Sequence, residues 1–363
     1  MPSTASPALP HLSETLHALG AGSAEADAAG RLQAKQICLI HDNDWLRLLV
    51  PQAIGGRELP LPEMVRLEEA IAQADGSCGW VVTLCAGAAW FTGFLPPELG
   101  RQIMATPQVC LAGSGAPTGY AERDGEGWRL NGQWRHASGS QLVTHFTFNA
   151  QLREDGQAML DAQGRARTCA FVVPATQVVV EADSWHSVGL RATTSQAFSV
   201  QNLWVPQAQA FVIDASHATA TGPLYRFPFE ALAFVTLAAN LLGMARHFMV
   251  LAQPLAVRHL PHLNGPSAEL QELWQSCDQS LQSLRSDFYA QLDSVWLATL
   301  QGAADAAHNQ QLVNTSRALA RHARECVDAL YPCCGLHAAD PRTEINRVWR
   351  DLHTASQHAI WLR

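Results

Sequence analysis

The chain has 363 residues, 48% of them hydrophobic, and a formal net charge of −8. This length exceeds one ordinary hydrophobic core and predicts about two or three domains. No long basic run is present, so nucleic acid and anionic membranes are excluded as expected partners. No segment reaches about 18 uninterrupted apolar residues, which argues against a membrane span.

The cysteines and histidines limit the expected compartment and chemistry. The opening stretch, MPSTASPALPHLSETLHALG, lacks a basic region followed by apolar residues, so we expect no signal peptide. Nine cysteines are scattered without a CxxC pair, which is typical of reduced thiols in a cytoplasm. His259 and His262 flank Pro261, and His353 and His358 are five residues apart. Neither spacing suits a metal ion, so we expect no metal site. The scattered cysteines and the lack of a signal-peptide pattern predict a cytoplasmic protein.

Residues 1–108 have the pattern of a helical domain. Met64, Leu67 and Ile71 recur at helical spacing, and Pro62 lies near the start of that segment as a first-turn residue. The segment 77–94 is apolar on all sides. Such a helix is normally buried in the middle of a bundle.

Residues 109–215 change to a pattern of strands and turns. Asn131-Gly132 lies between two short aromatic-flanked runs in 128–134 and predicts a tight hairpin turn there. Further predicted strands have the sequences HFTFNAQL, TCAFVVP, VVVEADSW and QAFSVQNLWVP. Together they predict a compact β domain.

Residues 222–363 are helical again. Long helices are predicted over 229–250, 268–299 and 305–330, and long helices joined by short loops favour an antiparallel bundle. The predicted fold class is therefore α+β, with a helical domain, a β domain and a helical bundle in that order. In the last stretch one helical face is shared by Ile345, Val348, Trp349, Leu352, Ala355 and Ala359.

Generic catalytic motifs are missing from the sequence. It contains no P-loop, no GxGxxG after a strand, no GxSxG and no HExxH. Gly113-Ser114-Gly115 is a small glycine cluster without the rest of a dinucleotide fingerprint. The residues alone indicate a soluble, three-part, enzyme-like protein.

Three stretches resemble the acyl-CoA dehydrogenase superfamily. They are LVPQAIGGRELPLPEMVRLEEAIAQADGSCGW at 49–80, GWRLNGQWRHASGSQLVTHF at 127–146, and NRVWRDLHTASQHA at 346–359. The resemblance implies an N-terminal helical domain, a middle β domain and a C-terminal antiparallel bundle. It also implies a flavin held between the β domain and the bundle, usually in a homotetramer.

The same resemblance implies residues that contact the flavin. Trp134 aligns with the family tryptophan beside the isoalloxazine ring, and Ser138, in His136-Ala-Ser-Gly, falls where relatives place flavin-contacting groups. His136, Gly113 and Ser114 are further candidates for contact with the cofactor. A packing role stays open for Trp134, as a cross-strand aromatic, and a capping role stays open for Ser138, as a turn residue.

This sequence lacks a glutamate at the position where most acyl-CoA dehydrogenases have their catalytic base. Their glutamate falls at Ala359, and a methyl group cannot accept a proton. A second known position for the base, on the first long bundle helix, falls near Ala233, one turn after Glu230. Glu230 is therefore the candidate base of a divergent dehydrogenase, provided that it lies within hydrogen-bond reach of its proton.

His358 resembles the flavin-dependent monooxygenase branch instead. In that branch reduced flavin arrives from a separate reductase and reacts with O2, and a serine and a histidine near the ring stabilise the flavin C4a-hydroperoxide. Ser138 and His358 are the matching candidates here, because an imidazole can donate a hydrogen bond to the developing peroxide. An unbroken helix would turn His358 away from the apolar face and leave His353 beside it, so a role for His358 requires the helix to end or bend.

The stretches that should bind the adenine half of the cofactor match the family motifs less well than those near the flavin ring. The family's Arg-x-x-Phe-Gly stretch corresponds to Arg258-HLPHLNG, without the Phe-Gly, and its glycine-rich loop corresponds to YPCCGLH at 331–337. Fewer glycines allow less close approach of a phosphate to the backbone. FMN, loosely bound reduced flavin and FAD held differently all stay open, with Arg258 as the candidate contact.

Three functions are consistent with this pattern. The first is an oxygenase that acts on a small-molecule substrate with reduced flavin, O2 and a separate flavin reductase. The second is a divergent FAD-dependent acyl-CoA dehydrogenase that uses Glu230. The third is a non-catalytic member of the fold, acting as a structural subunit or a ligand-binding partner. In each we expect a homo-oligomer, either a dimer or a tetramer.

Overall fold

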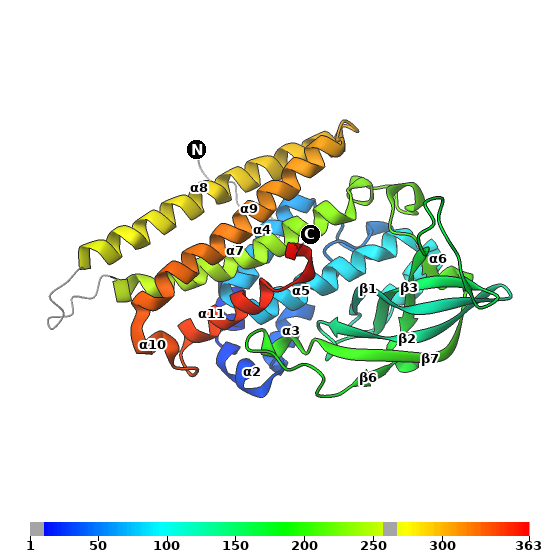
Figure 1. The fold of residues 1–363 in the computed structure, drawn as a ribbon, viewed down its shortest axis with the longest axis horizontal. Helices are drawn as coiled ribbons and strands as arrows, with labels where there is room; N and C mark the ends of the chain where they lie inside the picture. Colours follow the sequence, from blue (N-terminus) through cyan, green and yellow to red (C-terminus); the bar gives the residue numbers. More distant parts are fainter. Residues whose placement is uncertain (1–10, 257–266, 363) are drawn as a thin grey trace.

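The N-terminal region is built from helices, as Figure 1 shows in blue and cyan. The computed structural model describes residues 11–256 and 267–362. The predicted boundary at residues 108 and 109 falls between the last N-terminal helix and the first strand, and the domain limits stay a prediction. These helices are α1 (Leu12–Gly20), α2 (Ser23–Ala29), α3 (Ala34–Asp42), α4 (Leu61–Ala74), α5 (Gly76–Trp90) and α6 (Pro97–Met104).

Helix α5 is buried nearly all round, as its uniformly apolar sequence predicts. Asp75 caps it, because its carboxylate accepts a 2.6 Å hydrogen bond from the Cys78 backbone N–H. The segment Gly76–Phe94, which contains α5, and the first bundle helix, α7 (Phe229–Ala256), are each long and apolar enough to cross a membrane by length and composition. Their apolar windows are 83% and 78% buried inside the protein, as in core helices.

The middle region is one sheet in the order β6-β7-β2-β1-β3-β5-β8, with β4 paired to β3. Strands β1 and β3 are parallel, and the other pairs are antiparallel. One face carries an aromatic core that includes Phe146, Phe148 and Phe198. The strands are β1 (Leu111–Asp124), β2 (Gly127–Ala137), β3 (His145–Glu154), β4 (Gln157–Ala158), β5 (Thr168–Pro174), β6 (Val179–Glu181), β7 (Gln196–Pro206) and β8 (Ala210–Phe211).

The hairpin turn predicted at Asn131-Gly132 is wrong. The turn between β1 and β2 is Gly125-Glu126, where Gly125 has φ 60°, and Asn131-Gly132 lies in the middle of β2. Pairing with β7 shifts register beside Gly132. A Cβ at Gly132 would come within 2.5 Å of the Gly119 Cα, so glycine is needed there for close strand contact rather than for a turn.

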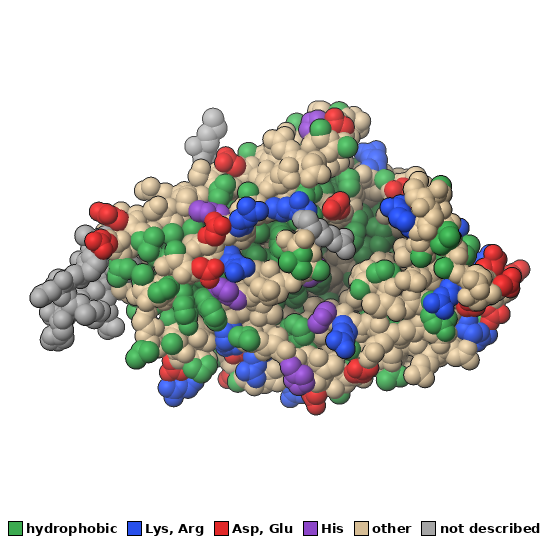
Figure 2. Space-filling model, in the orientation of Figure 1, with side chains coloured by type: hydrophobic (Ala, Val, Ile, Leu, Met, Phe, Trp, Pro, Cys, Tyr) green, Lys and Arg blue, Asp and Glu red, His purple; other side chains and the backbone are tan. Residues whose placement is uncertain are grey.

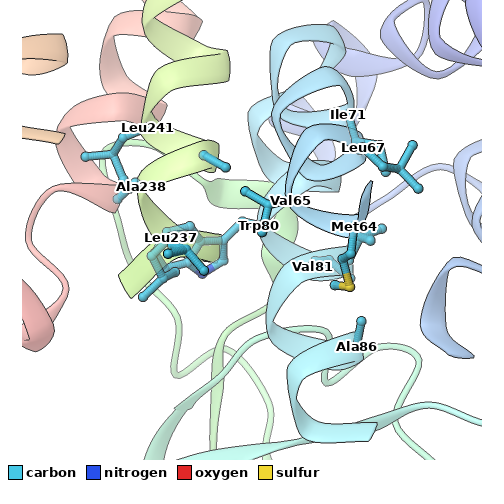
Figure 3. Close-up of a cluster of buried hydrophobic side chains, with 14 of the residues drawn as sticks. Met64, Val65, Leu67, Ile71, Trp80, Val81, Ala86, Leu237, Ala238 and Leu241 are labelled. Atoms are coloured by element: carbon cyan, nitrogen blue, oxygen red, sulfur yellow. The ribbon is translucent and has the colours of Figure 1, made fainter. Parts of the chain in front are cut away.

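The C-terminal region is a bundle in which α7 packs against α4, α9 and α11, and α8 packs against α9. Figure 3 shows side chains of α4, α5 and α7 meeting in one apolar cluster, which includes Val65, Trp80 and Leu241. This cluster joins the N-terminal helices to the bundle. Beside α7, the bundle helices are α8 (Ser267–Leu300), α9 (Ala306–Leu330), α10 (Gly335–Ala339) and α11 (Glu344–Ala355).

The last helix is shorter than its apolar pattern predicts. α11 ends at Ala355, and the chain continues through a turn into a 3-10 helix over Ala359–Leu362. Ala359 therefore does not share the face of α11, and this part of the prediction is wrong. The exposed Ala359 lies beyond the turn, where the backbone N–H of His358 bonds the Ala355 carbonyl at 3.2 Å.

Candidate flavin site

Two bent backbone segments lie side by side at the base of the candidate site. One begins in the last residues of β2 and includes His136 (φ 66°) and Gly139 (φ 80°). The other precedes β7 and includes Leu190 (φ 50°) and Thr194 (φ 45°). The Gly139 N–H donates to the Thr193 carbonyl at 2.8 Å. Left-handed backbone at non-glycine residues costs energy and clusters at functional sites, so these paired turns are where a site is expected.

A directed chain of hydrogen bonds runs through these turns. The Trp80 indole N–H donates to the Ser138 hydroxyl at 3.1 Å, and Ser138 lies 2.8 Å from the Ser195 hydroxyl. Ser195 lies 2.7 Å from the Thr193 hydroxyl, which donates to the Leu190 carbonyl at 2.8 Å. Each hydroxyl has one proton, so Ser138 donates to Ser195, and Ser195 donates to Thr193.

His358 contacts this series of hydrogen-bonded residues through the ring of Trp80. The two rings meet edge to face with centroids 5.9 Å apart. The end of α11 at Ala355 permits this contact, because the turn brings His358 back toward α5. Ser138 and His358, the two residues predicted for oxygen chemistry, therefore both contact Trp80.

The turn before β7 anchors α11 and thereby places His358. The buried Asp351 carboxylate accepts a 2.5 Å bond from the Leu190 N–H, and the Thr354 hydroxyl accepts a 2.9 Å bond from the Gly189 N–H. A Cβ at Gly189 would lie 2.0 Å from the Arg350 carbonyl oxygen, so only glycine fits. Burial raises the pKa of Asp351 to about 7, although the Leu190 N–H opposes this shift.

The C-terminal segment adds aromatic walls. Trp361 packs edge to face on Phe234 of α7 at 5.7 Å, and the Arg317 guanidinium lies 4.6 Å above the same ring. The Trp361 indole N–H is buried without a hydrogen-bond partner among the described residues. Figure 2 shows the surface hollowed beside this segment, with hydrophobic side chains on the walls. Apolar walls with a few converging polar groups suit a planar, partly polar ring such as isoalloxazine.

Trp134 and His136, the other β2 candidates, have different surroundings. Trp134 is fully buried against Phe148 and Phe198, and its indole N–H donates to the Asn149 carbonyl at 2.8 Å. This is the cross-strand packing that the sequence left open. His136 is exposed, and burial of part of its ring lowers its pKa. A flavin contact stays a prediction for both.

Gly113 and Ser114 lie in β1 where it runs parallel to β3. A Cβ at Gly113 would lie 1.6 Å from the Thr147 carbonyl oxygen, so this glycine lets two strands approach. Gly113→Ala should therefore lower the free energy of unfolding by at least about 2 kcal/mol, measured by urea denaturation. Gly115→Ala is the matched control, because its Cβ would meet nothing within 4 Å. Equal stability of the two variants would refute this strand-contact role.

The structure separates three other candidates from the Ser138–His358 pair. His353 points at α9, with Nε2 2.7 Å from the Asp328 carboxylate and its ring tilted against that of Trp349, with centroids 4.2 Å apart. Glu230 is exposed in the first turn of α7. Arg258, like His259 and His262, lies outside the described residues.

Ser195 and Thr193 were missed in the sequence, and Trp80 was considered only as a possible pocket-lining or core aromatic, without its hydrogen bond. Trp80 falls in a segment that predicts only a buried core helix, and nothing in the sequence distinguishes its indole N–H from the apolar side chains around it. Ser195 and Thr193 stand in Arg191-Ala-Thr-Thr-Ser, a run of hydroxyl residues between two predicted strands. That run is the one local signal for them.

The chain resembles known proteins in sequence. Residues 276–362 match the family model for the acyl-CoA dehydrogenase C-terminal domain. The oxygenase component of a FADH2-dependent resorcinol hydroxylase from a Rhizobium strain is 25% identical over 358 residues, which cover 92% of this chain and 85% of the relative.

The fold is shared with solved structures along nearly the whole chain. The HsaA monooxygenase of Mycobacterium tuberculosis superposes with a TM-score of 0.87 at 19% identity, covering 96% of this chain and 92% of that one. The chain has the acyl-CoA dehydrogenase-like fold, and its C-terminal part matches that family. XiaF from Streptomyces, solved with FADH2 and glycerol, has a TM-score of 0.86 at 21% identity and covers 97% of this chain and 91% of its own. The predicted α+β fold is thus confirmed, and the similar proteins include the oxygenase component of a FADH2-dependent hydroxylase.

Proposed function

We propose that this protein is a flavin-dependent oxidoreductase, the oxygenase component of a two-component system. A separate reductase would supply reduced flavin, and the protein would use it with O2 to oxygenate a small-molecule substrate. We further propose a soluble, cytoplasmic homo-oligomer, a dimer or a tetramer as in the superfamily. The resorcinol hydroxylase relative supports the reduced-flavin part of this proposal.

The pairing of Ser138 and His358 around Trp80 carries the proposal. Both polar groups belong to one site, whereas the position of the dehydrogenase glutamate is an exposed alanine, Ala359. The alternative base, Glu230, is also exposed. The site is therefore equipped with hydrogen-bond groups for a polar oxygen species and not with a carboxylate base at either of the two known positions.

Bound reduced flavin supplies the electrons with which O2 is activated. The residues of this chain supply position and hydrogen bonds: the imidazole at 358 and the hydroxyl at 138 are each a group that can donate a hydrogen bond to a partially charged oxygen atom. The aromatic residues Trp80 and Trp361, the latter packed on the buried Phe234, would shield the bound ring from water.

The orientation of the Ser138, Ser195 and Thr193 hydroxyl groups determines whether Ser138 can donate a hydrogen bond to a ligand. In the arrangement described, its proton is directed to Ser195, so an incoming oxygen would meet a lone pair. If Thr193 turns its proton from the Leu190 carbonyl to Ser195, the chain reverses and Ser138 is free to donate outward. Three short hydroxyl contacts make this reversal possible by bond rotation alone.

The cofactor is a flavin, and we propose FAD or FMN held mainly by its ring. The 331–337 segment forms a short 3-10 helix, Tyr331–Cys334, followed by α10. Gly335 there has φ 63°, and a Cβ at this position would meet nothing within 4 Å. The backbone around Gly335 therefore offers few contacts that could hold an adenine moiety.

Stopped-flow mixing of the protein and anaerobically reduced FAD or FMN with O2 tests the proposal. We expect the absorbance of oxidised flavin to return after a delay, in two phases, where free flavin gives one. A single phase identical with and without protein, for both flavins, would reject the oxygenase function and favour the non-catalytic alternative. Bleaching of bound oxidised flavin by an acyl-CoA thioester would instead establish the dehydrogenase.

Ser138→Ala is the first variant for this assay. It removes the hydroxyl that accepts from Trp80 and donates to Ser195, and we expect the delay to shorten by about tenfold or more. Ser216→Ala is the control, because Ser216 is exposed in a 3-10 helix that precedes the bundle. An unchanged delay in Ser138→Ala would remove this hydroxyl from the mechanism.

A further inference from the structure

Two thiols face each other across the pair of helices α8 and α9, which lie side by side in Figure 1. Cys277 of α8 and Cys326 of α9 are both buried, with 8% and 2% of their surface exposed. The Cys326 Sγ lies 3.8 Å from the Cys277 carbonyl oxygen. A hydrogen bond from the Cys326 thiol to the Cys277 sulfur lowers the pKa of Cys277.

An imidazole completes this cluster. The His322 Nε2 lies 3.4 Å from the Cys326 Sγ and 2.7 Å from the Ser280 hydroxyl. Its Nδ1 lies 3.6 Å from the Glu325 carboxylate, and 29% of the His322 side chain is exposed. A small solute can therefore reach the cluster from the His322 side, and the ring is placed to exchange a proton with the Cys326 thiol.

We propose that Cys277 and Cys326 form an oxidisable dithiol that hydrogen peroxide converts to a disulfide between α8 and α9. The Cys277 thiolate attacks one peroxide oxygen, the O–O bond breaks, and the departing hydroxide leaves as water after taking a proton. Cys326, whose proton passes to His322, then attacks the sulfenic sulfur and displaces the second hydroxide as water. Two thiols and one peroxide give one disulfide and two waters.

Peroxide is an oxidant that such a protein would meet. Reduced flavin and O2 yield hydrogen peroxide whenever no substrate consumes the activated oxygen. The dithiol itself does not depend on the proposed oxygenase function, because peroxide can be added from outside. The crosslink would join the two helices that form the outer layer of the bundle.

A second thiol pair provides an internal control. Cys85 and Cys110 are also hydrogen-bonded to each other, but both are fully buried, and burial together with this bond raises the pKa of Cys110. The described residues place no histidine in hydrogen-bond contact with either thiol. Buried thiols without an electropositive neighbour are inert, so this pair should stay reduced under the same conditions.

Non-reducing peptide mapping of the full chain after stoichiometric hydrogen peroxide tests the proposal. A Cys38→Ser background prevents disulfides between molecules, because Cys38 is exposed. We expect a linked peptide pair containing Cys277 and Cys326, reversed by dithiothreitol, with Cys85 and Cys110 still alkylatable. In Cys326→Ser we expect a dimedone adduct at Cys277 in place of the crosslink.

His322→Gln separates a proton-transfer role from simple proximity. The crosslink should form at least about tenfold more slowly in this variant, with unchanged far-UV circular dichroism. Either of two results would overturn the proposal: oxidation that leaves Cys277 and Cys326 as free thiols, or crosslinking of Cys85 and Cys110 at the same rate. Because added peroxide is the oxidant, neither result depends on whether the protein oxygenates a substrate.

Discussion

Replacement of His358 by asparagine should shorten the delay before oxidised flavin reappears by about tenfold or more, with flavin affinity nearly unchanged. Asparagine keeps a hydrogen-bond donor but loses the ring that packs on Trp80 and the imidazole that can hold a proton. Stopped-flow absorbance with reduced flavin and O2 measures the delay, and titration with oxidised flavin measures the affinity.

His353→Asn is the matched control for this variant. His353 lies five residues earlier, and its ring is committed to Asp328 and the Trp349 carbonyl. Its replacement should affect the stability of the α9–α11 contact and leave the delay unchanged. If His353→Asn shortens the delay as much as His358→Asn does, the assignment of His358 is wrong and the histidines act through the position of α11.

Regular elements were predictable because their signals are local. Three predicted strands, at 145–152, 168–174 and 196–206, lie within observed ones, and the uniformly apolar 77–94 segment became the buried helix α5. The prediction of a hairpin turn at Asn131-Gly132 failed because a glycine in a strand-rich segment can either form a turn or allow two strands to approach closely. Turn formation and close strand contact have the same local sequence, and only the pairing of β1 with β2 distinguishes them.

The candidate site was only half predictable. Ser138 and His358 came from resemblance, whereas Trp80, Thr193 and Ser195 enter through contacts between residues more than fifty positions apart in the chain, such as the Trp80–Ser138 hydrogen bond. The role of His358 depended on where α11 ends. No proline or glycine marks that end in the sequence after Ala355, so helical periodicity alone favoured a longer helix.

Glu68 should make the stability of the protein strongly dependent on pH. It lies on α4, fully buried, and neither carboxylate oxygen has a hydrogen-bond partner among the described residues. Thr83 lies beside it, but the Thr83 hydroxyl also accepts from Asn240. Burial raises the pKa of Glu68 from 4.5 to about 8, so the folded protein keeps this proton at neutral pH.

The sign of the effect follows from proton binding. Between the unfolded pKa of 4.5 and the folded pKa of about 8, the folded state holds a proton that the unfolded state has released. The free energy of unfolding is therefore highest below that window. It falls as the pH rises through the window, by at most roughly 1.4 kcal/mol per pH unit. Glu68→Gln is neutral at every pH and should remove the fall.

Urea unfolding of wild type and Glu68→Gln between about pH 5 and about pH 9 measures the difference. The two proteins should be similar at the acidic end, and the variant should be the more stable one at the alkaline end. Glu69→Gln is the control on the same helix, because Glu69 accepts bonds from Arg246, Arg285 and Tyr289. Its loss should destabilise by roughly 2 kcal/mol at neutral pH. Parallel pH curves for wild type and Glu68→Gln would mean that the Glu68 carboxylate is ionised and solvated in the folded protein, and that α4 and α5 open to admit water there.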